Sequence, residues 1–411
     1  MPADMSPLRR QFFLSYAVIG SVMPLMSVFL WREGGLSFRQ IGLTMALTNV
    51  PMVLMPALIT FFADRRTDPR RILAGAFMVS GMVLSMLYVS KSLALTLALF
   101  VFHGLAFVAM LPLQDGFYFS LVEHRRRSGL ATPPYPRVRV FGTVGFILPS
   151  VILFFLIRPG GSVKVILPCA VAFCLLSLAN TFTLPRLPAG AARNVGEPLP
   201  TLEALRKLVS PEARWLCLAL GLSYIAMVSY YTFMPIYFRG VIGVEERHIG
   251  LIINLGVLIE IGFTVFMPAI QQRLRLKGIM VVGMLGTVLR MALLAACPTI
   301  WTAILTQVVH GMEVLALFIA PVMFLNRLAG DRFRNSIQGV FTMIFGGLFR
   351  VAGSLSAGWI AERSLTGLLV WTSALVFAAM LVILFLFKRI PDPRELESGG
   401  DGEGNAEGAA A

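Results

Sequence analysis

The chain has 411 residues, of which 57% are hydrophobic and 14% are charged, and its mean hydropathy is +0.80. A soluble domain of this size needs a larger polar surface, so the composition excludes a water-soluble protein and indicates an integral membrane protein. The formal net charge of +14 would suit nucleic-acid binding, but the placement of the basic residues argues against it.

Twelve apolar stretches are long enough to cross a bilayer as helices of about 20 residues each. They leave almost nothing for a soluble domain, so the protein is predicted to be a bundle of membrane helices. The expected spans are approximately residues 11–31, 41–63, 72–90, 93–121, 138–158, 163–185, 213–237, 247–270, 278–296, 299–327, 335–361 and 365–387.

The basic residues are distributed unevenly between the two sides of the predicted bundle. Most of the 35 Lys and Arg fall before the first span, in alternate loops and after the last span. This bias follows the positive-inside rule and predicts that both termini are cytoplasmic, in the inner membrane of a cell. The basic charge therefore sets the topology, and we expect the lipid bilayer and no nucleic acid as a partner.

The longest polar stretch between spans, 186–210, divides the twelve spans into two sets of six. We expect residues 1–185 and 211–390 to form two six-helix halves, 186–210 a cytoplasmic central loop, and 391–411 a disordered cytoplasmic tail, because the tail is polar and rich in Gly and Ala. Short motifs recur between the halves at offsets of 211, 208 and about 207: Met23-Pro24 and Met234-Pro235, Ile41-Gly42-Leu43 and Ile249-Gly250-Leu251, and Val101-Phe102-His103-Gly104 and Val308-Val309-His310-Gly311. Two repeated six-helix halves are the architecture of major facilitator transporters, which bind substrate between the halves.

Ionisable side chains occur inside the predicted spans, where a charge costs about 2.5–3.5 kcal/mol at the bilayer centre. Such groups persist when they pair or face water, and they mark the pathways of substrates and protons. A structural ion pair that fixes helix register is the alternative for any single pair. The seven groups are Asp115, Arg139, Glu260, Arg290, His310, Glu313 and Arg350.

His310 and Glu313 lie one helical turn apart, which suits proton transfer. A transporter driven by protons needs a carboxylate that gains and loses a proton near physiological pH. Burial favours the protonated carboxyl, whereas an approaching arginine favours the carboxylate. Alternating approach of Arg290 or Arg350 to Glu313 would therefore load and release a proton, and His310 could relay it or bind the substrate. His103 has no acid three residues on, so we expect it to pack or hydrogen-bond.

Two stretches carry a family resemblance. One runs from Gly250 through Pro268, Arg290 and His310 to Glu313, and the other joins Pro112-Leu-Gln-Asp115 to Arg137-Val-Arg139-Val-Phe-Gly142-Thr-Val-Gly145-Phe146. Over essentially all twelve spans the chain resembles the lactose permease, nucleoside:proton symporter and phenylpropionate permease branch of the major facilitator superfamily. The resemblance implies an all-α integral membrane fold of twelve transmembrane helices in two pseudo-symmetric halves.

The resemblance also implies roles for individual residues. By position, Glu313 matches the family's proton-carrying glutamate, Arg290 the arginine that helps to deprotonate it, and His310 the histidine that links substrate to that carboxylate. In the first half, Asp115 matches a substrate-binding acid and Arg139 its arginine partner. Phe146 matches the position of an aromatic side chain that stacks on the substrate.

Several positions depart from the family pattern. The acid of the eighth span falls at Val257, while Glu260 lies one turn further on. Arg350 matches a lysine of a charge pair, but the seventh span offers no acid, so we expect Arg350 to pair with Glu260 or Glu313. Gln307 stands where lactose permease has a lysine. Proton coupling is therefore predicted from Glu313, His310, Arg290, Glu260 and Arg350, and substrate binding from Asp115, Arg139, Phe146 and His310.

Together these features predict a proton-coupled symporter, working as a monomer, that imports a small organic solute by alternating access. The candidate substrates are a sugar or glycoside, a nucleoside or an aromatic acid. The alternative within transporters is a proton antiporter that exports drugs or metabolites. An enzyme is not expected, because the loops are short and basic and carry no nucleophile–base set, and no metal or cofactor is expected.

Overall fold

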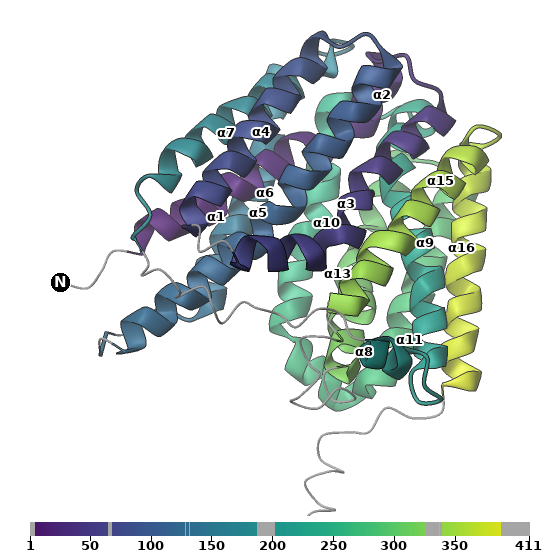
Figure 1. Ribbon diagram of the computed structural model, residues 1–411. Coiled ribbons are helices and arrows are strands. Elements are labelled where there is room, and N and C mark those ends of the chain that lie inside the picture. The colour runs from purple at the N-terminus through teal and green to yellow at the C-terminus, as the bar shows by residue number, and fades with distance from the viewer. Residues whose placement is uncertain are drawn as a thin grey trace, which may run out of the picture.

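The computed structural model describes residues 5–64, 68–127, 129–130, 132–186, 202–325, 337 and 339–387. Those residues are organised as helices joined by short connections (Figure 1). The predicted tail, 391–411, and most of the predicted central loop, 186–210, lie outside the described residues.

The N-terminal half is built from helices that cross the bundle in alternating directions (Figure 1). The first span is divided at Pro24, which cannot donate a backbone hydrogen bond, so α1 ends before it and α2 begins after it. The elements are α1 Ser6–Val22, α2 Met26–Arg32, α3 Phe38–Asp64, α4 Pro69–Val89, α5 Leu93–Arg127, α6 Tyr135–Leu156, the short 3-10 turn η1 Val163–Val165, and α7 Ile166–Thr181.

The C-terminal half repeats this arrangement but contains more irregular helix. Four π-helical turns occur in it, η3, η4, η5 and η6, in spans that are otherwise α-helical. The elements are α8 Leu202–Leu208, α9 Arg214–Tyr237, η3 Phe238–Ile242, α10 Glu246–Val265, α11 Met267–Ala296, α12 Ile300–Leu305, α13 Val308–Val314, η4 Leu315–Ile319, η5 Thr342–Leu348, α15 Phe349–Ala361, α16 Leu365–Leu381 and η6 Val382–Leu386.

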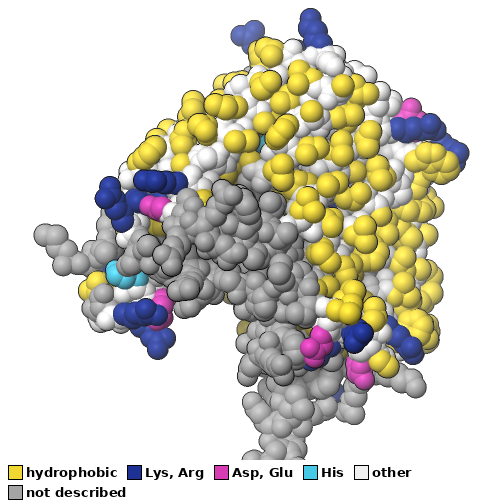
Figure 2. Space-filling view, viewed as in Figure 1, with side chains coloured by type: hydrophobic (Ala, Val, Ile, Leu, Met, Phe, Trp, Pro, Cys, Tyr) yellow, Lys and Arg dark blue, Asp and Glu magenta, His cyan; other side chains and the backbone are white. Residues whose placement is uncertain are grey.

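The helices confirm the predicted all-α membrane fold. Within the described residues, eleven helices are long and apolar enough to cross a bilayer, and α3, with 27 residues, completes the predicted set of twelve. In Figure 2 hydrophobic side chains cover most of the described surface in the upper and right parts of the view, and Lys and Arg lie mainly at its margins. This distribution is expected for a protein whose hydrophobic surface faces lipid tails and whose two ends face water.

One short helix lies where the sequence predicted only loop. Residues Leu202–Leu208 form α8, with Glu203 in its first turn and Arg206 and Lys207 in its last, an arrangement that complements the helix dipole. Its Ala204 and Leu208 are buried in the hydrophobic core of the C-terminal half. Burial of this apolar face explains a helix that polar composition alone does not predict.

The connections α2–α3, α4–α5, α6–η1, η3–α10, α11–α12 and α15–α16 all lie at one end of the bundle, which we name the short-loop end. The two halves meet there through α2 against α9, α6 against α10, and α3 against α15. Contact between α3 and the eleventh span continues further, to Val53 beside Gly347. The core of the N-terminal half accordingly extends into Tyr230, Phe233 and Ile249 of the other half.

Candidate functional site

The tenth span is interrupted where its charged residues lie. The helix α12 ends at Leu305, a turn follows at Thr306 and Gln307, and α13 then carries His310 and Glu313 before the π-helical turn η4. Interruptions and π-turns within helices are frequent at functional sites, because they redirect side chains that a regular helix would present elsewhere. The hydrophobic pattern predicted the span but not this break.

An ion pair occupies the centre of this site. Arg290 on α11 donates from Nη1 to Oε2 of Glu313 over 3.1 Å, and their side chains are 0% and 2% exposed. The guanidinium also lies 4.7 Å from the ring centroid of Tyr230 on α9, close enough for a cation–π contact. In this structure the Glu313 carboxylate therefore has the positive charge of Arg290 beside it.

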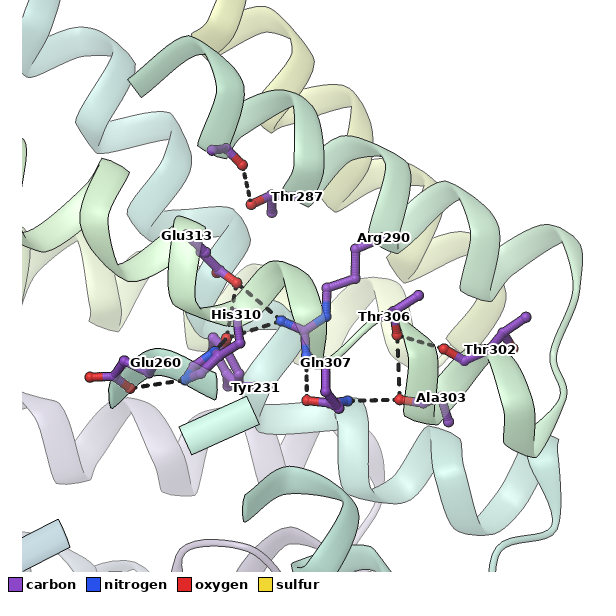
Figure 3. Close-up of polar contacts among 11 residues, drawn as sticks. Tyr231, Glu260, Thr287, Arg290, Thr302, Ala303, Thr306, Gln307, His310 and Glu313 are labelled. Atoms are coloured by element: carbon purple, nitrogen blue, oxygen red, sulfur yellow. Dashed lines mark hydrogen bonds and ion pairs between the residues drawn. The ribbon is translucent and has the colours of Figure 1, made fainter. Parts of the chain in front are cut away.

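Tyr231 on α9 links this ion pair to His310. Its hydroxyl oxygen lies 2.7 Å from Nδ1 of His310 and 3.0 Å from Oε2 of Glu313, and it accepts from Nη1 of Arg290 over 3.3 Å (Figure 3). One hydroxyl therefore touches three ionisable groups. The sequence did not predict this bridging role for Tyr231, because a tyrosine in an apolar span carries no signal that separates hydrogen bonding from packing.

Glu260 on α10 is the accessible end of the same chain of contacts. Its Oε2 lies 3.3 Å from Nε2 of His310, and the two side chains are 34% and 17% exposed. Figure 3 shows the resulting line of side chains, from Arg290 and Glu313 through Tyr231 and His310 to Glu260. We name these five residues the charge relay. It runs from a fully buried ion pair to a partly exposed carboxylate. Its residues come from four helices, α9, α10, α11 and α13.

Arg350 does not join the charge relay. The pairing of Arg350 with Glu260 or Glu313, expected from the sequence, is not found: Glu260 pairs with His310 and Glu313 pairs with Arg290. Arg350 lies near Tyr224 of α9 instead, and its Nε is buried without a hydrogen-bond partner among the described residues. The π-helical turn η5 ends at Leu348, two residues before Arg350, and helical spacing alone does not place a side chain after such a turn.

The predicted substrate-binding residues of the N-terminal half lie on α5 and α6. The hydroxyl of Tyr135 donates to Oδ1 of Asp115 over 2.9 Å, and the guanidinium of Arg139 lies 4.0 Å from the ring centroid of Tyr16. Because α6 begins at Tyr135, Arg139 belongs to its second turn. Phe146 follows two turns later on the same face.

The direct ion pair expected between Asp115 and Arg139 is absent from this structure. Both residues are described, and no ion pair within 4.0 Å joins them. Two tyrosines provide the contacts instead: Tyr135 hydrogen-bonds Asp115, and Tyr16 lies beneath Arg139. The arrangement leaves each charged group with a neutral neighbour.

A second polar network in this half has no formal charge. Asn180 on α7 donates to Oε1 of Gln11 over 2.8 Å, Ser15 donates to Oε1 of Gln114 over 2.5 Å, and Nε2 of Gln11 lies 3.4 Å from the hydroxyl of Ser15. These side chains are buried and connect α1, α5 and α7. Hydrogen-bonded neutral groups of this kind hold helices together without the cost of burying charge.

His103, the repeat counterpart of His310, lies in a different environment. It is buried, its Nδ1 lies 3.3 Å from the hydroxyl of Ser80, and it contacts the rings of Phe100 and Phe107. This is the packing and hydrogen-bonding position that the sequence predicted.

Among the residues the structure describes, no group of three His, Cys, Asp or Glu could hold a metal ion.

An all-helical bundle of membrane spans with ionisable side chains inside the bundle is typical of a membrane transporter. A model of the MFS_1 like family matches residues 6–369. The chain therefore belongs to this family of the major facilitator superfamily, and it is a secondary transporter rather than an enzyme.

Known transporters resemble the chain along most of its length. A maltose permease of Geobacillus stearothermophilus is 24% identical, over 92% of this chain and 93% of that protein. A xanthosine permease of Escherichia coli (strain K12) is 22% identical, over 95% and 97%. The crystal structure of the nucleoside transporter NupG superimposes with a TM-score of 0.81 at 19% identity, over 93% of this chain and 98% of that chain.

Proposed function

We propose that the chain is a proton-coupled symporter of the inner membrane that imports a small organic solute, with both termini in the cytoplasm. The charge relay is the observation that carries this proposal. It connects a buried carboxylate, Glu313, to a partly exposed one, Glu260, through groups that each can hold or pass a proton. A transporter that moved its solute without protons would have little use for so costly an arrangement in the membrane.

The geometry allows a proton to move between His310 and Glu313 through Tyr231. In one arrangement His310 carries both ring protons, and its Nδ1–H donates to the Tyr231 oxygen while the phenol donates to ionised Glu313. In the other, the phenol donates to Nδ1 of neutral His310 and protonated Glu313 donates to the phenol. The total number of protons is the same in both. The two arrangements interconvert when the Nδ1 proton of His310 moves to the phenol oxygen while the phenol proton moves to Glu313, and no side chain has to be displaced.

We propose that substrate binds between Asp115, Arg139 and Phe146 on one half and His310 on the other. Carboxylates accept hydrogen bonds from hydroxyls, and arginine can contact two acceptor oxygens at once. The relatives carry the names maltose permease, xanthosine permease and nucleoside permease. Among the candidate solutes we therefore place sugars and nucleosides ahead of aromatic acids.

Alternating access is supported by the way the halves meet. At the short-loop end, Arg32 on α2 and Arg239 in η3 both pair with Glu246 on α10, which is buried. Because Arg32 and Glu246 belong to different halves, this cluster closes the short-loop end, the side predicted to face away from the cytoplasm. Opening would release Arg32 to water, and Arg239 would still neutralise Glu246.

The test is external pH in a lightly buffered, de-energised suspension of expressing cells, to which sugars, nucleosides and aromatic acids are added one at a time. We expect transient alkalinisation with one class, absent in Glu313→Gln. That variant should lose uphill accumulation yet still exchange labelled solute across the membrane. The same change at the surface, Glu123→Gln, is the matched control and should leave both activities intact.

Two outcomes would contradict the proposal. Full uphill accumulation by Glu313→Gln would remove Glu313 from coupling. Acidification on addition of a solute would identify the alternative, a proton antiporter that exports drugs or metabolites and uses the same carboxylates.

A further inference from the structure

Gln307 connects the break in the tenth span to the buried ion pair. Its side chain is fully buried, and both of its polar ends are engaged. Nε2 donates to the carbonyl oxygen of Ala303 over 2.9 Å, and Oε1 accepts from Nη2 of Arg290 over 3.0 Å (Figure 3). The proton transfer described above does not use this residue.

The helix break is what orients the Gln307 side chain. In a regular helix the backbone N–H of Gln307 would donate to the carbonyl of Ala303, four residues back. Here it donates to Ile304, three residues back, over 3.1 Å. The carbonyl of Ala303 is thereby freed from the backbone, and it accepts from the Gln307 side chain and, over 3.4 Å, from the hydroxyl of Thr306. Since the amide nitrogen is fixed on that carbonyl, the amide oxygen is turned toward Arg290.

A glycine on the facing helix leaves room for this arrangement. A Cβ atom added to Gly256 of α10 would lie 3.0 Å from Oε1 of Gln307 and 3.1 Å from Cβ of His310. Either side chain would have to give way by a few tenths of an ångström. The close approach of α10 thus depends on the absence of a side chain at Gly256.

The guanidinium of Arg290 is consequently held on two sides. Nη1 faces Glu313 and Tyr231, and Nη2 faces Gln307. A planar guanidinium with both terminal nitrogens engaged cannot rotate away from Glu313 without breaking a buried hydrogen bond. Gln307 adds no charge of its own, so it orients Arg290 without competing for it.

We propose that Gln307 is a positioning residue for Arg290, which holds the guanidinium against Glu313 and thereby sets the pH range over which the coupling step operates. This inference rests on the proposed function. The ionisable groups that surround the ion pair are Tyr230 and Tyr231 on α9, His310 on α13 and, through His310, Glu260 on α10. The hydrogen bonds of Glu313 and Tyr231 to Arg290 are both on Nη1, whereas Gln307 holds Nη2.

The test is the pH dependence of solute uptake in the full-length Gln307→Met variant. Methionine is similar in size and cannot form either hydrogen bond. A carboxylate that loses part of the attraction of an arginine takes up its proton at higher pH. We therefore expect the pH at which uptake falls to half to rise by about one unit.

A buried glutamine in the other half supplies the matched control. Gln114 is equally buried, but its Oε1 accepts from Ser15 in the neutral network. The Gln114→Met variant should lower the thermal stability of the protein without moving the pH profile. If Gln307→Met fails to reach the membrane, Gln307→Asn, which keeps an amide too short to make both bonds, should give a smaller shift in the same direction.

An unchanged pH profile in Gln307→Met, or an equal shift in Gln114→Met, would overturn the inference. Glu313→Gln separates this failure from that of the proposed function. If Glu313→Gln loses uphill accumulation while the profile of Gln307→Met is unchanged, coupling stands and only the positioning role is wrong. If Glu313→Gln keeps uphill accumulation, the proposed function itself fails.

Discussion

His103 and His310 occupy matching positions in the two halves, yet their surroundings give them different chemistry. His103 meets the hydroxyl of Ser80 and two phenylalanine rings. His310 meets Tyr231 on one ring nitrogen and Glu260 on the other. A repeat therefore preserves the position of a residue, while the facing helices decide whether a histidine there packs or can transfer a proton.

The same contrast holds for the two halves as a whole. Buried polar groups of the N-terminal half are mostly neutral amides and hydroxyls, joined as Gln11, Ser15, Gln114 and Asn180. The C-terminal half buries charges as well: the ion pair of Arg290 and Glu313 in the charge relay, and Glu246. Neutral networks hold helices at low cost, whereas buried charges are costly and are retained where they serve a function.

The largest expected effect on stability is at the buried ion pair. Arg290→Met leaves the Glu313 carboxylate uncompensated, which should cost about 3–5 kcal/mol in the free energy of unfolding. The double variant Arg290→Met with Glu313→Met should recover much of this loss, because no charge is left buried. Thermal unfolding in detergent measures both. An Arg290→Met variant as stable as the parent would mean that water reaches Glu313.

The two histidines provide the next prediction. His310→Gln should lower uphill uptake about 100-fold, within the usual range for losing a proton-transfer group. His103→Gln should change uptake little and cost about 1 kcal/mol of stability from its hydrogen bond to Ser80. Initial rates of uptake at equal expression give the comparison. Equal losses in the two variants would show that the charge relay has no special role.

A smaller effect is expected on the N-terminal side of the proposed substrate site. Asp115→Ala should weaken substrate binding by about tenfold, the effect of losing a hydrogen bond to a charged group. Tyr135→Phe, which removes only the hydroxyl that contacts Asp115, should weaken it less. Counterflow measured against substrate concentration reports the affinity. Unchanged affinity in Asp115→Ala would exclude Asp115 from the site.

The smallest effect is expected at an ion pair outside the spans. Asp68, just before α4, accepts from Nη2 of Arg70 over 2.5 Å, and this bond lowers the pKa of the carboxyl below its usual 3.8. A carboxyl whose pKa is lowered by folding stabilises the folded state at pH values above its ordinary pKa. This contribution is lost as the pH falls through the lowered pKa. For a partly exposed pair it should be below about 1 kcal/mol. Asp68→Asn should remove this pH dependence, measured by thermal unfolding between pH 5 and pH 2.

The sequence by itself determined the architecture and showed which charged residues lie inside the spans. Length and hydropathy defined the membrane spans, because a bilayer accepts only apolar helices of about 20 residues. Charges are so costly at that depth that Glu260, Arg290, His310 and Glu313 stood out without any structure. The spacing of His310 and Glu313 placed them on one helix face, and the fold keeps them together.

Only the tertiary structure decided which of these groups are partners. The partner of Arg290, the bridging hydroxyl of Tyr231 and the separation of Asp115 from Arg139 depend on which helices face each other across the bundle. The break at Thr306 and Gln307 is decided by local backbone hydrogen bonding, to which a hydrophobic pattern is insensitive. Helical periodicity fixes the direction of a side chain within its own span, and the packing of the other spans determines what that side chain meets.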